Sequence, residues 1–135
     1  MTIPWDEMIT AATAVRERAH APYSRFKVGA AVWCGDGSIA VGCNVENRAL
    51  PLSICAERTA MASAVAGGNG APRAVVVVTD ADPPATPCGM CREFLREFAA
   101  DLPILAVNLA GNRREYRLDE LLPHAFVLPA ESERR

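Results

Sequence analysis

The sequence lacks the surplus of positive charge that is typical of nucleic-acid-binding proteins. Its 14 Lys and Arg residues stand against 16 Asp and Glu residues, for a net charge of -2. A protein that binds a phosphate backbone needs clustered cations, because much of its affinity comes from the release of counterions. The charge balance therefore disfavours a nucleic acid as partner and favours a small molecule.

The sequence also lacks a long apolar run. Runs such as Ala74–Val78 are far shorter than the roughly 20 residues that a membrane-spanning helix needs. The first residues, MTIPWD, do not show the charged and then apolar pattern of a signal peptide. The 5 cysteines are an odd number, so metal ligation or catalysis explains them better than a disulfide framework. These features predict a cytoplasmic protein that does not bind membranes.

Half of the 135 residues are hydrophobic, which predicts a single domain over residues 1–135 with a substantial core. Apolar residues recur at helical spacing from Trp5 to Ala19, so we expect an amphipathic helix that ends before Pro22. Period-two alternation from Arg25 to Trp33, turn residues at 35–37 and further extended sequence at 38–43 predict a hairpin.

The second half of the chain alternates between helical and extended patterns. The predicted elements are a helix from Cys55 to the glycines at 67–70, a buried central strand at 74–79, a helix from Cys88 to about Ala99, a strand at 103–108, a short extended segment at 115–117 and a helical turn at 118–122. Such alternation favours right-handed crossovers between parallel strands. The charged tail at 131–135 is expected to be loose.

Two short motifs at the starts of two predicted helices supply three thiols and one carboxylate. Cys55-Ala56-Glu57 opens the first helix, and Pro87-Cys88-Gly89-Met90-Cys91 precedes and opens the second. Three thiolates leave the fourth corner of a tetrahedral zinc free for water, whereas a structural zinc normally has four protein ligands. We therefore predict one catalytic Zn²⁺ per chain, held by Cys55, Cys88 and Cys91.

Glu57 lies two residues after the first ligand, close to the metal without having to bind it. Zinc lowers the pKa of a bound water from 15.7 to about 7, and a nearby carboxylate can carry the proton to a substrate. Three thiolates reduce the acidity of the metal, and we expect Arg58 and Arg92 to restore it by donating hydrogen bonds to the sulfurs. A Glu after the first ligand, followed later by P-C-x-x-C, is the pattern of zinc nucleobase deaminases.

These motifs together resemble the small cytidine deaminases that act on free nucleosides, and the similarity runs from residue 21 to about residue 126. It rests on YSRFKVGAA at 23–31, NVEN at 44–47, CAERTA at 55–60 and PCGMCR at 87–92. The resemblance implies an α/β fold, a three-layer α/β/α sandwich around a mixed five-stranded sheet. It also implies a homotetramer and a role in pyrimidine salvage.

In that family the matching residues have defined roles. Glu57 would move protons from the water to N3 and to the leaving amine. Phe26 would stack on the pyrimidine, and Asn44 and Glu46 would hydrogen-bond the sugar hydroxyls. The backbone of Ala56 and of Cys88 would face the edge of the base.

The sequence departs from the family pattern after the NVEN motif. The family usually has small residues there and then a tyrosine that helps to hold the sugar from an adjacent subunit, whereas Arg48-Ala49-Leu50 stands here. Because Leu50 cannot donate a hydrogen bond and Arg48 adds a charge, we hypothesise a preference for a nucleoside with an anionic or larger 5′ group. Phe126 resembles the aromatic residue that reaches a neighbouring pocket, so Arg48, Leu50 and Phe126 are the inter-subunit candidates.

The leading interpretation is hydrolytic deamination of cytidine or 2′-deoxycytidine to the uracil nucleoside and ammonia. One alternative is a deaminase of a modified cytosine nucleoside such as blasticidin S, against which Glu46 argues, because those relatives typically lack this acid. The alternatives outside this class are a structural zinc site with Cys34 or Cys43 as fourth ligand and a thiol redox pair of Cys88 and Cys91.

Overall fold

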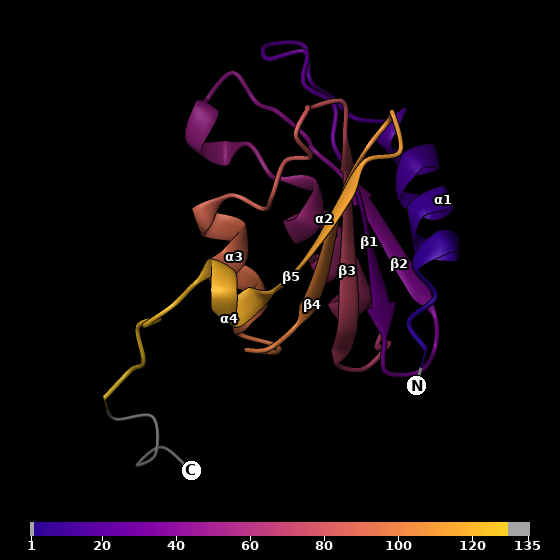
Figure 1. The fold of residues 1–135 in the computed structure, drawn as a ribbon. Helices are drawn as coiled ribbons and strands as arrows, with labels where there is room; N and C mark the ends of the chain where they lie inside the picture. The colour runs from indigo at the N-terminus through magenta and orange to yellow at the C-terminus, as the bar shows by residue number, and fades with distance from the viewer. Residues whose placement is uncertain (1, 130–135) are drawn as a thin grey trace.

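The computed structural model describes residues 2–129, which are built around a five-stranded sheet with strand order β2-β1-β3-β4-β5 (Figure 1). The strands are β1 (Gly29–Cys34), β2 (Ile39–Cys43), β3 (Pro72–Thr79), β4 (Pro103–Asn108) and β5 (Arg113–Arg117). β3 and β4 pair in parallel, and the other neighbours are antiparallel. The sheet is therefore mixed, as predicted. The tail predicted at 131–135 lies outside the described residues.

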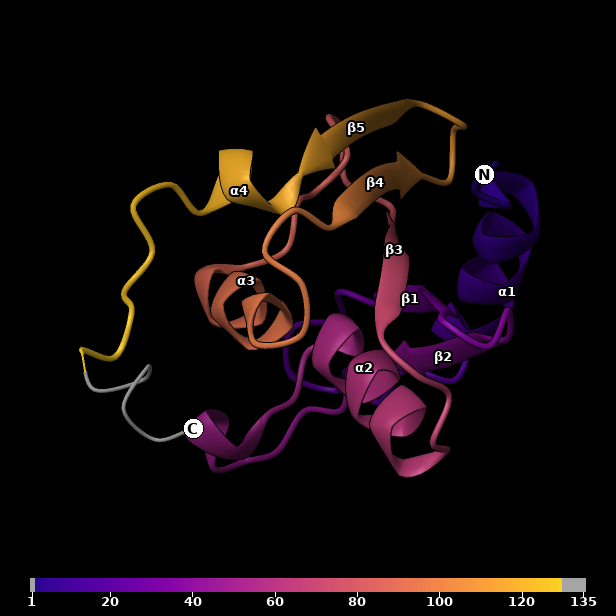
Figure 2. The same cartoon turned by 90° about the horizontal axis from the view of Figure 1, so that it is seen from below.

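Helices cover both faces of the sheet. Helix α1 (Trp5–Arg16) lies on one face, and α2 (Ala56–Ala66) and α3 (Gly89–Arg96) lie on the other (Figure 2). A 3₁₀ turn, η1 (Leu50–Leu52), precedes α2, and the short α4 (Leu118–Leu121) follows β5. This arrangement confirms the predicted three-layer α/β/α sandwich. Among residues 2–129, no helix combines the length and the apolar character that a bilayer span requires.

The central strand β3 shows why the sheet needs helices on both sides. Val75 and Val77 belong to the core cluster under α2 and α3, while Val76 and Val78 belong to the cluster under α1. All four are at most 1% exposed. An uninterrupted β-branched run forms a strand that is buried on both faces, so the predicted central position is confirmed.

Two glycines let the helices approach the sheet closely. A Cβ atom at Gly42 of β2 would lie 2.3 Å from the backbone N of Ala60 in α2, and one at Gly29 of β1 would lie 2.0 Å from the backbone O of Ala12 in α1. No real Cβ contact is that short, so a side chain at either position would push a helix away. Gly42 thereby fixes the height above the sheet of the helix that carries Glu57.

Several element boundaries differ from the prediction. Strand β1 begins at Gly29 rather than near Arg25. The backbone groups of Phe26 and Val28 form hydrogen bonds with the side-chain amide of Asn44 and not with a neighbouring strand. Helix α3 ends at Arg96 rather than near Ala99, where the N–H groups of Phe98 and Ala99 both turn back to the carbonyl of Leu95. Strand β5 begins two residues early, at Arg113.

Candidate active site

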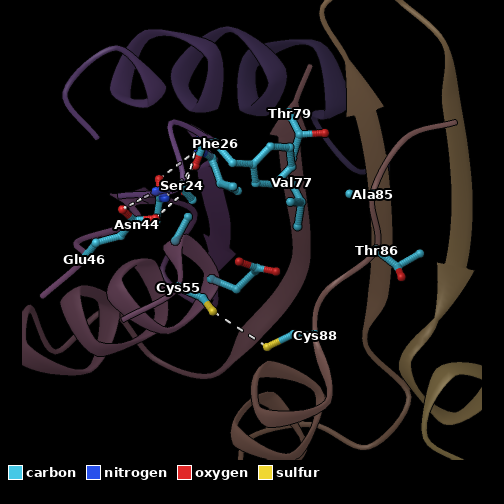
Figure 3. A pocket seen from close by; sticks show the side chains of 13 residues that line it. Ser24, Phe26, Asn44, Glu46, Cys55, Val77, Thr79, Ala85, Thr86 and Cys88 are labelled. Atoms are coloured by element: carbon cyan, nitrogen blue, oxygen red, sulfur yellow. Dashed lines mark hydrogen bonds between the residues drawn. The ribbon is translucent and has the colours of Figure 1, made fainter. Parts of the chain in front are cut away.

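The fold brings together the ends of two helices that are distant in the sequence. Cys55 is the N-cap residue of α2, Cys88 is the N-cap residue of α3, and Cys91 lies in the first turn of α3. The three sulfur atoms lie within 4.8 Å of one another, and the Sγ atoms of Cys55 and Cys88 are 3.7 Å apart (Figure 3). A tetrahedral zinc with Zn–S bonds of about 2.3 Å places its sulfurs about 3.8 Å apart. The donor set therefore fits zinc.

The electrostatics of the cluster favour the thiolate form of Cys55, at the N-terminus of α2. The hydrogen bond with Cys91 lowers the pKa of the Cys55 thiol to about 5, and the guanidinium of Arg58 acts in the same direction. The same hydrogen bond, together with burial, raises the pKa of Cys91. One thiolate therefore forms readily beside a thiol that retains its proton, and a bound cation would favour ionisation of the remaining thiols.

Glu57 is a buried carboxyl group in the first turn of α2. Glu57 is only 4% exposed, and burial raises the pKa of its carboxyl group to about 7. The charge of Cys55 raises the pKa further, and the charge of Arg58 opposes this. A carboxyl group with a pKa close to neutrality can both accept and release a proton under working conditions.

Glu57 and two of the cysteines open into one cavity of about 220 Å³. From the two helix N-termini it is lined by Cys55, Ala56, Glu57 and Cys88, and from the segments before β1 and after β2 by Ser24, Phe26, Val28, Asn44 and Glu46. Phe26, Val77 and Thr79 also share the lining of this cavity (Figure 3). The structure thus brings the four predicted substrate-contact residues, Phe26, Asn44, Glu46 and Ala56, into the cavity that also holds Glu57.

Asn44 and Glu46 are held in place by the backbone of residues 23–28. The side-chain amide of Asn44 accepts a hydrogen bond from Val28 N and donates one to Phe26 O, both at 2.8 Å. The carboxylate of Glu46 accepts hydrogen bonds from Tyr23 N at 3.0 Å and Ser24 N at 3.1 Å. Both side chains are therefore preorganised at the cavity wall.

Comparison with known proteins identifies the family. The model of the cytidine and deoxycytidylate deaminase zinc-binding region matches residues 4–106. The chain belongs to this deaminase family. A cytidine deaminase of Sporosarcina psychrophila is 43% identical over 122 residues, which cover 90% of each chain.

Solved structures of cytidine deaminases have the same fold. The enzyme from Burkholderia pseudomallei superposes with a TM-score of 0.87 at 44% identity, and the match covers 93% of this chain and 100% of that one. The enzyme from Mycobacterium tuberculosis gives a TM-score of 0.82 at 37% identity, with coverage of 94% and 100%. The deaminase fold thus extends over nearly the whole chain.

The two arginines that were predicted to contact the sulfurs behave differently. Burial opposes the charge of Arg58, but the hydrogen bond and charge of Cys55 outweigh it and raise the pKa of the guanidinium. Arg92 does not donate to sulfur, contrary to the prediction. Its nitrogens donate instead to Pro87 O and Leu121 O, each at 2.7 Å, and to Thr86 Oγ1 at 2.9 Å. Arg92 therefore ties the loop before α3 to the end of α4.

The remaining cysteines do not complete the metal site. Cys34 is fully buried within the core cluster under α2, and burial raises the pKa of its thiol. Neither Cys34 nor Cys43 belongs to the group of sulfurs at the helix ends. The geometry thus disfavours a structural zinc with four cysteines, and the proximity of Cys55 disfavours a simple redox pair of Cys88 and Cys91.

The inter-subunit candidates lie outside the cavity of the single chain. Leu50 and Phe126 are each 68% exposed, and Arg48 is exposed on the loop before η1. None of the three lines the cavity.

Sequence reasoning missed six residues that line the cavity, namely Ser24, Val28, Val77, Thr79, Ala85 and Thr86. Ser24 and Val28 could have been found, because both lie within the YSRFKVGAA motif at 23–31. The others come from the end of a uniformly apolar strand and from a loop, where no periodicity marks the side facing the site.

Proposed function

We propose that the chain is a zinc-dependent cytidine deaminase that converts cytidine or 2′-deoxycytidine to uridine or deoxyuridine and ammonia. The observation that carries the proposal is a cluster of three thiols within 4.8 Å of one another, two of them at the sulfur spacing of tetrahedral zinc, beside a cavity that holds the buried Glu57. Membership of the deaminase family supports the reaction, and relatives named cytidine deaminase support a nucleoside substrate.

Zinc bound by Cys55, Cys88 and Cys91 would supply a water molecule of lowered pKa at its fourth position. Glu57 would move both protons of that water, the first to N3 of the pyrimidine and the second to the departing amine. The bond from C4 to oxygen forms and the bond from C4 to the exocyclic nitrogen breaks, so water and cytidine become uridine and ammonia. The pKa of Glu57 near 7 suits both halves of this transfer.

The lining residues from the segments before β1 and after β2 hold the substrate. Phe26, 37% exposed, offers an aromatic face for the pyrimidine. The free N–H of the Asn44 amide and the carboxylate of Glu46 meet the sugar hydroxyls. The backbone of Ala56 and of Cys88 faces the base edge from the two helix N-termini. Arg58 supports the site by its interaction with Cys55.

The same proposal extends to the assembly and setting of the protein. A homotetramer is supported by large apolar side chains that are exposed in the single chain, such as Leu50, Leu52 and Phe126. A reducing, cytoplasmic setting suits the 5 cysteines, all of which are free. The single sheet, covered on both faces, supports one domain over the chain, and the product supports a role in pyrimidine salvage.

A substrate panel tests the proposal. Zinc-loaded protein is incubated with cytidine, deoxycytidine, cytosine, CMP and blasticidin S, and ultraviolet loss and ammonia release are measured. We expect turnover of the two nucleosides with about one zinc per chain. Zinc without turnover of either nucleoside would indicate a structural or interaction module instead. Cys88→Ser should lose the zinc. Its control is Cys43→Ser, which changes a cysteine outside the sulfur cluster and should keep the zinc.

The hypothesis about Arg48 needs its own comparison. If Arg48 favours an anionic or larger 5′ group, Arg48→Ala changes the ratio of kcat/KM between cytidine and its 5′-modified analogues. An unchanged ratio would remove Arg48 from substrate selection.

A further inference from the structure

The hydroxyl of Ser24 lies between two residues that the proposed function places against the substrate. Its oxygen donates a hydrogen bond to Oε2 of Glu46 and accepts one from the backbone N–H of Phe26 at 3.0 Å (Figure 3). Ser24 lines the cavity together with both residues. One hydroxyl group thus joins the carboxylate that meets the sugar to the backbone that carries the stacking ring.

On the Glu46 side, the hydrogen bonds determine which acceptor position stays open. Oε1 accepts the backbone N–H groups of Tyr23 and Ser24, and Oε2 accepts the hydroxyl of Ser24. A carboxylate offers about four acceptor positions, two on each oxygen. Three are used, so the remaining position is on Oε2, beside the Ser24 hydroxyl. A ligand hydroxyl therefore meets Glu46 in a direction that Ser24 sets.

On the Phe26 side, side chains hold both backbone polar groups. Phe26 N donates to Ser24, and Phe26 O accepts from the amide of Asn44. Arg25, between Ser24 and Phe26, has a φ of 59°, a left-handed conformation that is uncommon for a residue with a side chain. The Ser24 hydrogen bond spans this residue, so it maintains the turn that directs Phe26 into the cavity.

We propose that Ser24 is a positioning residue for nucleoside binding, which sets the open acceptor of Glu46 and the backbone of Phe26 through one hydroxyl group. The inference rests on the proposed function of the site and deepens it. Ser24 acts before the chemical step, so its removal weakens binding and leaves proton transfer by Glu57 intact.

The test separates the hydroxyl from the shape of the residue. We expect Ser24→Ala to raise the KM for cytidine about tenfold, the value of one hydrogen bond to a charged group, while kcat stays within about twofold and the zinc content is unchanged. Ser24→Thr keeps the hydroxyl and should restore KM to within about threefold of the unmodified enzyme. Melting curves of both variants verify that they fold.

The hairpin turn offers a matched control. Ser38 donates its backbone N–H and its hydroxyl to Oδ1 of Asp36, at 2.9 and 2.6 Å, the same pairing of serine and carboxylate outside the cavity. Ser38→Ala should leave KM unchanged.

A double-mutant cycle tests whether Ser24 acts through Glu46. We expect the KM of Ser24→Ala/Glu46→Gln to lie within about threefold of the KM of Glu46→Gln alone. A KM equal to the product of the two separate effects, or a Ser24→Ala enzyme with unchanged KM, would overturn the role of Ser24 and leave the proposed function standing. No ammonia release by the unmodified protein would refute the proposed function and the role of Ser24 with it.

Discussion

Glu57 carries a carboxyl group where a charge is costly. It is 4% exposed in the first turn of α2, and burial is the main cause of its raised pKa. A buried carboxyl group that is not needed for chemistry would normally be replaced by an apolar residue, because an unpaired buried charge destabilises the fold. Because Glu57 lies close to Cys55 in the predicted zinc site, we infer that its buried carboxyl group serves proton transfer.

Replacement of Glu57 by glutamine should separate proton transfer from metal binding. Glu57→Gln keeps the size of the side chain, so we expect full zinc content and a fall in kcat of about 10²- to 10⁴-fold or more. Steady-state kinetics and elemental analysis measure the two quantities. Glu93→Gln, which alters an exposed carboxylate on α3, is the control. A zinc-loaded Glu57→Gln enzyme with activity close to that of the unmodified enzyme would require a different base.

Asp36 gives a pH prediction that concerns stability alone. Hydrogen bonds from Asn69 and then from Ser38 lower its pKa from 3.8 to about 2. Because the folded-state pKa is depressed, the stabilisation is fully present above pH 3.8 and is lost as the pH falls towards 2. The difference in free energy of unfolding between the unmodified protein and Asp36→Asn should therefore shrink over this interval in urea titrations. A difference that stays constant would contradict the assignment.

At the scale of elements, the spacing between α2 and the sheet controls the site. Gly42→Ala would force the backbone of Ala60, and with it α2, away from β2, whereas Gly29→Ala would force α1 away on the opposite face. Overpacking of this kind typically costs about 1–3 kcal/mol. We expect both variants to be destabilised, but only Gly42→Ala to weaken zinc binding, because α2 carries Cys55 and Glu57.

Competition with a zinc chelator and thermal melting measure the two effects. Equal zinc affinities in the two glycine variants would show that the metal site does not depend on the position of α2.

The elements that could be predicted are those whose pattern repeats over many residues. The apolar run of β3 and the helix that opens at Cys55 with glycines at its end are found where the sequence places them. The start of β1 could not be predicted, because the side-chain amide of Asn44 forms the backbone hydrogen bonds before Gly29 that a neighbouring strand would otherwise form. The contacts of Arg92 were missed for a similar reason, since a long side chain can reach acceptors, such as Leu121 O, that only the tertiary fold brings near.

At the scale of the whole molecule, the metal ligands join segments that the sequence separates by more than thirty residues. Metal binding by such a cluster adds to the free energy of folding. Removal of zinc with a chelator should therefore lower the Tm by about 10 °C or more, and added zinc should restore it. Calorimetry with and without chelator measures the change, and Cys88→Ser should show little response. A chelator-insensitive Tm in the unmodified protein would contradict a bound zinc at this site.

The central claim is that zinc is held by three sulfurs, with its fourth position open beside Glu57. X-ray absorption spectroscopy at the zinc edge tests it most directly. We predict three sulfur neighbours at about 2.3 Å and one lighter oxygen or nitrogen neighbour at about 2.0–2.2 Å. Four sulfur neighbours would show a closed structural site and contradict the account.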